Sequence, residues 1–344
     1  MHVLVTGGAG YIGTTLVPHL LQNDCDVTVV DRFYFGRDLI EGAVEDHAER
    51  VELVRADICD LEASDLEVVD VVIDLAGISN DPTCALNPEL TRRINKRGSI
   101  HMADLSAQAG VDRHIFASSC SVYGHGEDLG LTEEAPTNPM TLYAECKVAA
   151  EEGLFESAAR EDVTATALRF ATVFGLSPRM RFDLAINIMT QKAYIDSKVD
   201  VYGGGLQWRP FVHVKDIARA ICTTIQAPRE TVDGRVYNVG ANQNNLQIRN
   251  LAYRIRDRIP GTEINMTETD PDLRTYNVCF DRIRDELDFE PHKTIEDGID
   301  EVVAALASGR LTHDERRWYT LDQYQLLEEV QTLYPQLEID GSIL

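Results

Sequence analysis

Short runs of apolar, mostly β-branched residues alternate with longer amphipathic segments through the first half of the chain. Nearly continuous apolar runs of this length are typical of parallel strands buried on both faces. The segments between them have helical spacing. The alternation predicts an α/β fold, namely a Rossmann-type doubly wound parallel sheet. The predicted strands are 2–6, 26–31, 51–56, 69–76, 114–118 and 164–170, and the clearest predicted helices are 13–23, 88–109 and 142–160.

After about residue 170 the predicted strands and helices no longer alternate regularly. We therefore expect a Rossmann domain over residues 1–170 and, over 171–344, mainly a smaller mixed α/β substrate-binding region. Segments of the second part are expected to return to the Rossmann sheet. The amphipathic stretch 314–332 predicts a C-terminal helix that packs against the rest of the chain.

The acidic composition narrows the choice of partners. The 344 residues include 57 Asp+Glu against 32 Lys+Arg, which gives a formal net charge of −25. Nucleic acids and anionic membranes both require a basic surface, so neither is an expected partner. No stretch approaches the roughly 18 uninterrupted apolar residues of a membrane span. The seven cysteines are scattered without a CxxC pair, and no leader pattern precedes the first strand. We expect a cytoplasmic protein with reduced thiols and no metal site.

A glycine-rich turn at residues 6–13 (TGGAGYIG) joins the first predicted strand to the first predicted helix. Gly7 permits a tight turn, Gly10 lets the backbone approach a pyrophosphate, and Gly13 allows the helix to pack closely on the strand. The helix N-terminus, which includes Tyr11 and Ile12, offers free N–H groups and a positive dipole end to phosphates. The turn therefore predicts a dinucleotide site.

An aspartate at the end of the second predicted strand supports the same site. Asp31 can accept hydrogen bonds from an adenosine ribose, and its charge repels a 2′-phosphate, so NAD is favoured over NADP. Arg32 and Arg37 could soften that preference. After the third strand, Asp57 and Ile58 could bracket the adenine, with Asp57 accepting from its amino group; an ordinary strand-end turn is the alternative.

A serine-rich strand end and a helix carry the candidate chemistry. Ser119 lies in the segment 118–124 (SSCSVYG), and Tyr143 and Lys147 lie four residues apart on one helical face. A lysine ammonium favours the phenolate of a neighbouring tyrosine, and so does an oxidised nicotinamide ring. The phenolate could remove a proton from a sugar hydroxyl while a hydride leaves the same carbon. Ser119 would hydrogen-bond the reacting oxygen.

Taken in order, these motifs resemble the extended short-chain dehydrogenases/reductases, specifically the NAD-dependent nucleotide-sugar epimerases and dehydratases. The resemblance covers residue 6 to about 290, most of the chain. It rests on TGGAGYIG, SSCSVYG, YAECK, GGGLQWRPFVHVKD at 203–216 and NVG at 238–240.

The resemblance implies roles for individual residues. Tyr143 would be the catalytic base, Lys147 would hold the NAD ribose and lower the tyrosine pKa, and Ser119 would assist. Arg209 and Arg274 look like ligands of a substrate diphosphate, although a structural ion pair is the alternative for each. The NAD-binding residues would be Gly7, Gly10, Tyr11, Ile12, Gly13, Asp31, Asp57, Ile58, Tyr143 and Lys147, with no metal.

The chain departs from the family pattern at three places. Cys120 and Ser121 stand where 4,6-dehydratases carry Asp-Glu, which disfavours that dehydration. Thr172 stands where Asn is usual near the sugar phosphate; it keeps a donor with a shorter reach, so it remains a candidate substrate contact. Pro210 replaces the usual Asp after Arg209 and removes one possible arginine partner.

The favoured interpretation is an NAD-dependent nucleotide-sugar 4-epimerase that acts through a transient 4-keto intermediate. A dehydratase, decarboxylase or keto-sugar reductase of the same family is the first alternative. A catalytically idle NAD-binding regulator is the second. By resemblance we also expect a homodimer formed through the helices 88–109 and 142–160.

Charge along the chain agrees with a small anionic substrate. Residues 169–258 carry 14 Lys+Arg against 7 Asp+Glu, so this stretch is basic within an acidic protein. It includes Arg169, Arg179, Arg181 and Arg209, which we expect in the region that receives the sugar diphosphate. A solvated basic face would account for part of the excess.

Overall fold

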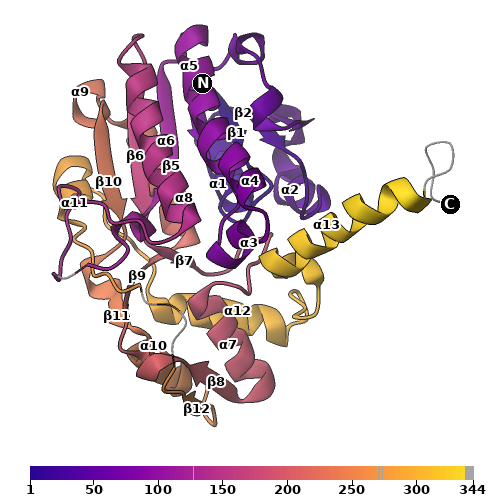
Figure 1. Ribbon diagram of the computed structural model, residues 1–344, viewed down its shortest axis with the longest axis vertical. Coiled ribbons are helices and arrows are strands. Elements are labelled where there is room, and N and C mark those ends of the chain that lie inside the picture. The colour runs from indigo at the N-terminus through magenta and orange to yellow at the C-terminus, as the bar shows by residue number, and fades with distance from the viewer. Residues whose placement is uncertain (127, 270–271, 273, 338–344) are drawn as a thin grey trace.

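A seven-stranded parallel sheet with the order β10-β6-β5-β4-β1-β2-β3 forms the core of the protein (Figure 1). The computed structural model describes the whole chain except residues 127, 270–271, 273 and 338–344. After β3 the chain crosses back to β4 beside β1, which makes the sheet doubly wound. The predicted fold class is thus confirmed. The strands are β1 (His2–Thr6), β2 (Asp26–Asp31), β3 (Val51–Arg55), β4 (Val71–Asp74), β5 (Arg113–Ser119), β6 (Thr164–Phe170) and β10 (Arg235–Val239).

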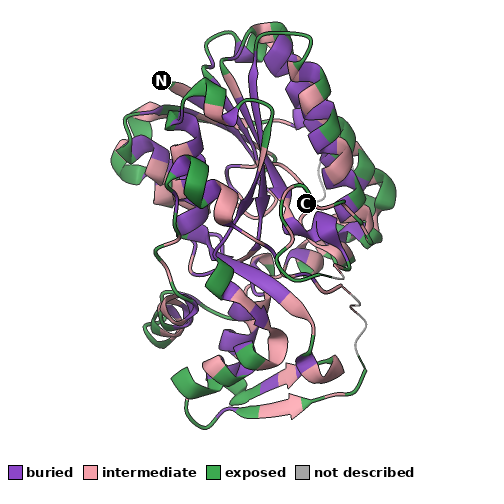
Figure 2. Cartoon of the chain, turned by 90° about the vertical axis from the view of Figure 1, so that its left-hand side faces the viewer, coloured by how far each residue is buried: buried purple, intermediate pink, exposed green. Residues whose placement is uncertain are grey.

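Helices cover both faces of this sheet. α1 (Gly13–Gln22) and α8 (Val214–Gln226) pack together on one face, and α5 (Ser99–Ala109) and α6 (Leu142–Ala158) pack together on the other. Figure 2 shows the strands buried between helices whose outer sides are exposed. This burial from both sides explains the nearly continuous apolar runs of the strands. Pairing of α5 and α6 with a second copy stays a prediction.

The predicted helix 88–109 is not regular. It consists of α4 (Pro88–Thr91), a π-helical segment over Arg92–Gly98, and α5. The π-helical segment contains Asn95, which is fully buried. Its side-chain Nδ2 donates to Ile78 O at 2.8 Å, and its Oδ1 accepts from Ile78 N at 2.7 Å. A single π-turn of this kind often marks a functional site. Here it fixes the loop after β4.

A second region lies below the carboxyl ends of the large sheet in Figure 1. It contains a three-stranded sheet, β11-β9-β7, and a two-stranded sheet, β12-β8. Between β9 and β11 the chain passes back through the large sheet by way of α8 and β10, and it then re-enters the second region. The domain boundary at residue 170 stays a prediction. The elements of the region are β7 (Thr172–Phe174), β8 (Lys198–Val201), β9 (Trp208–His213), β11 (Asn245–Gln247), β12 (Glu263–Met266), α7 (Ala185–Asp196), α10 (Ile248–Arg258) and α12 (Ile295–Ala307).

The C-terminal helix differs from its predicted range 314–332. A 3₁₀ turn at Arg316–Trp318 comes first, and α13 (Thr320–Leu337) follows. Trp318 is buried and its carbonyl accepts from Phe182 N at 2.9 Å, so tertiary packing interrupts the helical run at this point. The remaining helices are α2 (Asp38–Ala43), α3 (Asp81–Leu86), α9 (Arg229–Val232) and α11 (Asp281–Leu287).

Candidate active site

A cavity of about 620 Å³ lies at the carboxyl ends of the parallel strands, between the large sheet and the second region. Ligands of open α/β sheets bind at this edge, where the strand order reverses. The cavity brings together all the candidate catalytic, cofactor-binding and substrate-binding residues except Arg169, from elements far apart in the chain. They are Gly7, Gly10, Tyr11, Ile12, Gly13, Asp31, Asp57, Ile58, Ser119, Tyr143, Lys147, Thr172, Arg209 and Arg274.

The glycine-rich turn has the geometry of a phosphate loop. Gly7 has a φ of +65°, and a Cβ on it would lie 2.8 Å from the Ala76 Cα. A Cβ on Gly13 would lie 2.4 Å from Gly8 O, so only glycine lets the start of α1 pack this closely. Near Gly10 such an atom would meet only Gly7 O, at 3.0 Å. The space beside Gly10 is therefore open to a diphosphate at the helix N-terminus.

The side chain of Tyr11 connects the phosphate loop to the second region. Its hydroxyl donates to Gly175 O at 2.6 Å and accepts from Asn187 Nδ2 at 3.1 Å. Burial raises the pKa of this phenol above its usual value. Tyr11 is thus held as a neutral structural group, and its backbone remains part of the loop.

Asp31, at the end of β2, and Asp57, just after β3, line the cavity at its cofactor end. The Asp31 carboxylate accepts from Ala9 N at 3.0 Å and from Phe33 N at 2.7 Å. Burial raises the pKa of this carboxyl, and the backbone hydrogen bonds oppose the rise. Asp57 accepts from Arg32 at 2.9 Å and from Arg93 at 3.0 Å. Arg32 is thus tied to a carboxylate, and the acceptance of an adenine amino group by Asp57 stays a prediction.

Ser119, Tyr143 and Lys147 meet at the end of β5. Lys147 Nζ donates to Ala117 O at 2.6 Å and lies 5.8 Å from the centroid of the Tyr143 ring. Burial raises the pKa of the Tyr143 phenol, while the charge of Arg181 and a hydrogen bond with Ser119 lower it. In this structure the desolvation of the phenol outweighs these two effects, and the ammonium of Lys147 is bonded to a carbonyl. The expected lowering of the tyrosine pKa by Lys147 stays a prediction.

Arg209 and Arg274 share one carboxylate at the substrate end of the cavity. Arg209 donates to Asp272 Oδ2 at 2.9 Å, and Arg274 donates to both oxygens of Asp272, at 2.7 and 2.8 Å. Arg274 also pairs with Asp81. These contacts lower the pKa of Asp272 to about 2 although burial alone would raise it. Arg209 thus finds in Asp272 a carboxylate partner, although Pro210 stands where the family usually has an Asp. The binding of a diphosphate by Arg209 and Arg274 stays a prediction.

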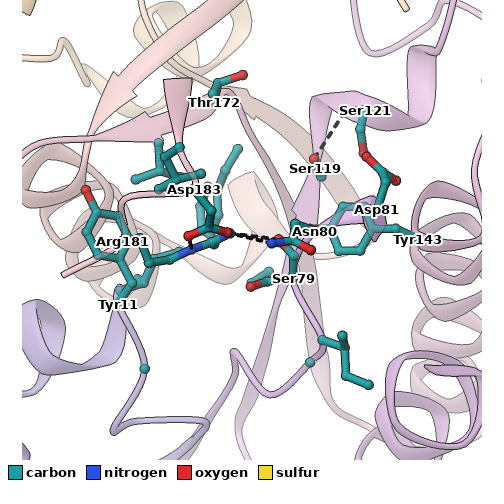
Figure 3. A pocket seen from close by; sticks show the side chains of 18 of the residues that line it. Tyr11, Ser79, Asn80, Asp81, Ser119, Ser121, Tyr143, Thr172, Arg181 and Asp183 are labelled. Atoms are coloured by element: carbon teal, nitrogen blue, oxygen red, sulfur yellow. Dashed lines mark hydrogen bonds and ion pairs between the residues drawn. The ribbon is translucent and has the colours of Figure 1, made fainter. Parts of the chain in front are cut away.

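A polar bridge that the sequence did not reveal crosses the cavity. Figure 3 shows Arg181 and Asp183 facing Ser79 and Asn80. Asn80 Nδ2 donates to Asp183 Oδ2 at 2.6 Å, and Arg181 donates to the same carboxylate at 2.6 and 3.1 Å and to Ser79 O at 3.1 Å. Only the charge of Arg181 hinted at this site, because the residues come from two loops without a motif.

The expectation that Arg169 faces the sugar diphosphate is wrong. Arg169 lies outside the cavity lining and forms a buried ion pair with Glu151, with an N–O distance of 2.7 Å. It belongs to β6, whose side chains are all buried, so its charge is neutralised within the protein. Beside it, Cys120 Sγ donates to Arg169 O at 3.2 Å, and burial raises the pKa of this thiol.

A family model for the NAD dependent epimerase/dehydratase family matches residues 3–240. The chain belongs to this family. Its cofactor is NAD, and Gly7, Gly13 and Asp31 form a site that fits it. No helix in the described part of the chain is long and apolar enough to span a membrane.

Relatives in the NAD dependent epimerase/dehydratase family match nearly the whole chain. A putative UDP-glucose 4-epimerase of Methanocaldococcus jannaschii is 27% identical over 307 residues, which cover 88% of this chain and 97% of the relative. The low-salt glycan biosynthesis protein Agl12 of Haloferax volcanii is 30% identical over 313 residues, with coverages of 88% and 97%. The fold matches that of UDP-glucuronic acid 4-epimerase from Bacillus cereus, at a TM-score of 0.80 and 23% identity over 90% of this chain and 99% of that one. Named relatives include epimerases and decarboxylases of nucleotide sugars, so the family is one of nucleotide-sugar enzymes.

Proposed function

We propose that the protein is an NAD-dependent nucleotide-sugar 4-epimerase in which Tyr143 is the catalytic base. The observation that carries this proposal is the composition of the cavity beside the phosphate loop. Ser119, Tyr143 and Lys147 all line this cavity. Cys120 and Ser121 stand where a dehydratase would carry its Asp-Glu pair, and the side chain of Cys120 is buried in the core, bonded to Arg169 O. Ser121, the other one, lines the cavity but carries no carboxyl group.

Carboxylates elsewhere in the cavity do not replace that pair. Asp183 is bonded to Arg181, and Asp81 is paired with Arg274. The neighbouring guanidinium lowers the pKa of Asp183 to about 2, although burial alone would raise it. A carboxyl with so low a pKa is a poor general acid near neutral pH. The set of side chains therefore favours oxidation and re-reduction at one carbon over elimination of water.

In the proposed reaction the Tyr143 phenolate removes the proton of the C4 hydroxyl, and Ser119 hydrogen-bonds the same oxygen. The phosphate loop and Asp31 would hold NAD, which would supply reversible hydride chemistry at C4, and the 4-keto sugar would turn in the cavity between the two transfers. The positive charge of the oxidised nicotinamide and that of Lys147 both favour the phenolate, and so oppose the effect of burial on the pKa of Tyr143. Tyr143 then returns the proton to the product.

The diphosphate of the substrate is proposed to lie between Arg209 and Arg274, near Thr172. A guanidinium binds phosphate oxygens through paired hydrogen bonds. In this structure both arginines are bonded to Asp272. Binding would require the diphosphate to share or replace that carboxylate.

A panel of UDP-, dTDP- and GDP-hexoses followed by NMR tests the proposal. Interconversion of one pair of 4-epimers without net consumption of NAD is the expected result. Tyr143→Phe should lower kcat by about 10² to 10⁴ while NAD binding persists, and Tyr253→Phe, at an exposed tyrosine, is the control. A 4-keto-6-deoxy product would indicate a dehydratase, CO₂ release a decarboxylase, and stoichiometric oxidation of NADH a reductase. Inactivity on every sugar with intact NAD binding would favour an NAD-binding regulator.

A further inference from the structure

Arg179 is a buried cation with no carboxylate partner within the part of the chain that the structure describes, unlike the other buried arginines around the site. Its side chain is 2% exposed and lines the cavity. The guanidinium donates one hydrogen bond, to Thr320 Oγ1 at 3.1 Å, and lies 3.7 Å from the centroid of the Phe35 ring. Its Nε is buried without an acceptor among the described residues.

The isolation of this charge is costly for the protein. Burial and the neighbouring charge of Arg181 lower the pKa of Arg179 to about 9. By contrast, Arg169, Arg181 and Arg209, all nearly as buried, each bind a carboxylate within 3 Å. Unpaired buried charges are strongly unfavourable and persist where a ligand or partner completes them. The site around Arg179 is therefore built for an anion that comes from outside the chain.

The position of Arg179 indicates which anion it meets. Its backbone N–H donates to Thr14 Oγ1 at 3.3 Å, so the residue is fastened to the first turn of α1. Two residues earlier, Ser177 Oγ donates to Tyr11 O at 2.7 Å. The guanidinium is also close enough to Asp31 for its charge to lower the pKa of that carboxyl. Arg179 thus lies between the phosphate loop and the aspartate at the ribose end of the dinucleotide site.

We propose that Arg179 binds the diphosphate of NAD. The phosphate loop offers only backbone N–H groups and a helix dipole, and Arg179 adds a full positive charge that is already desolvated. The diphosphate of the sugar substrate is a less suitable ligand, because Arg209 and Arg274 occupy the substrate end of the cavity. The proposal depends on the cofactor alone, and it holds whichever sugar the enzyme uses.

The C-terminal helix holds the guanidinium in place. Thr320 begins α13, and Tyr324, one turn later, packs edge-on against Phe35 with ring centroids 6.0 Å apart. Gln323 Nε2 donates to Tyr34 O at 2.7 Å, which ties α13 to the loop after β2. The plane of Arg179 is therefore set before the ligand arrives, which lowers the entropic cost of binding.

Titration calorimetry of the full-length protein stripped of NAD tests this assignment. Arg179→Met should weaken the binding of both NAD and ADP by about 10- to 100-fold, the usual range for a charged hydrogen-bonding group. Arg179→Lys, which keeps the charge, should lose less. Arg113→Met is the matched control, because Arg113 donates to the carbonyl oxygens of Thr224 and Ala227 at the opposite end of β5, away from the cavity.

Thermal unfolding without ligand separates binding from folding. Because the variant Arg179→Met removes an unpaired buried charge, its melting temperature without NAD should equal or exceed that of the wild type, while the stabilisation by added NAD shrinks. The proposal is overturned if NAD and ADP bind Arg179→Met within threefold of wild type. It is also overturned if ADP binding is unchanged while NAD binding falls, or if weaker binding accompanies a lower melting temperature of the ligand-free variant.

Discussion

The buried ion pair between Glu151 and Arg169 should be a large determinant of stability, and Glu151→Leu removes it. The two side chains are each 7% exposed. Arg169 donates to the two carboxylate oxygens at 2.9 and 2.7 Å, and Ser118 donates to one of them. Without the carboxylate, the one side-chain acceptor that Arg169 keeps among the described residues is the Tyr123 hydroxyl, at 3.0 Å. Leaving one buried charge unpaired costs about 3–5 kcal/mol.

Urea denaturation measures this cost. Glu151→Leu should reduce the free energy of unfolding by that amount, and the double variant Glu151→Leu/Arg169→Met should recover most of it because no charge then remains buried. Glu152→Leu is the control: the neighbouring glutamate is exposed, and its loss should change stability by no more than about 0.5 kcal/mol. A loss below about 1 kcal/mol in Glu151→Leu, or a double variant no more stable than the single one, would refute the reasoning.

Three further predictions concern pH, the cofactor loop and the substrate. Burial lowers the pKa of His114 to about 4 from 6.5, so the unfolded state binds the extra proton first. Stability should fall by up to about 3 kcal/mol between pH 6.5 and 4, and His114→Phe should flatten this part of a urea-denaturation pH series. Gly13→Ala places a Cβ 2.4 Å from Gly8 O and should weaken NAD binding at least about tenfold by calorimetry, whereas Gly42→Ala, in open space, should not. Arg209→Met should raise KM for the nucleotide sugar about 10- to 100-fold with a smaller change in kcat; an unchanged KM would remove Arg209 from the proposed diphosphate site.

The sequence alone was sufficient for six of the seven strands of the large sheet, all but β10, and for the cofactor end of the site. Strand β1, the turn with Gly7 and Gly13, and Asp31 at the end of β2 follow one another within one βαβ unit, so their relative placement is fixed by local geometry. Tyr143 and Lys147 share a helical face for the same reason. Their joint position on one cavity follows because the carboxyl ends of parallel strands meet at one edge of the sheet.

Partners of the arginines could be found only in the tertiary structure. Arg274 meets Asp81 across 193 positions of sequence, and Arg179 meets Thr320 across 141. Hydrophobic spacing fixes which face of an element is buried, but it does not say which loops come together above the sheet. The stretch around Arg169 and Arg179 was basic in sequence, yet one of these charges is neutralised in the core and the other faces the cofactor cavity. Charge along a chain gives the number of cations in a region, and only folding decides which of them are left for a ligand.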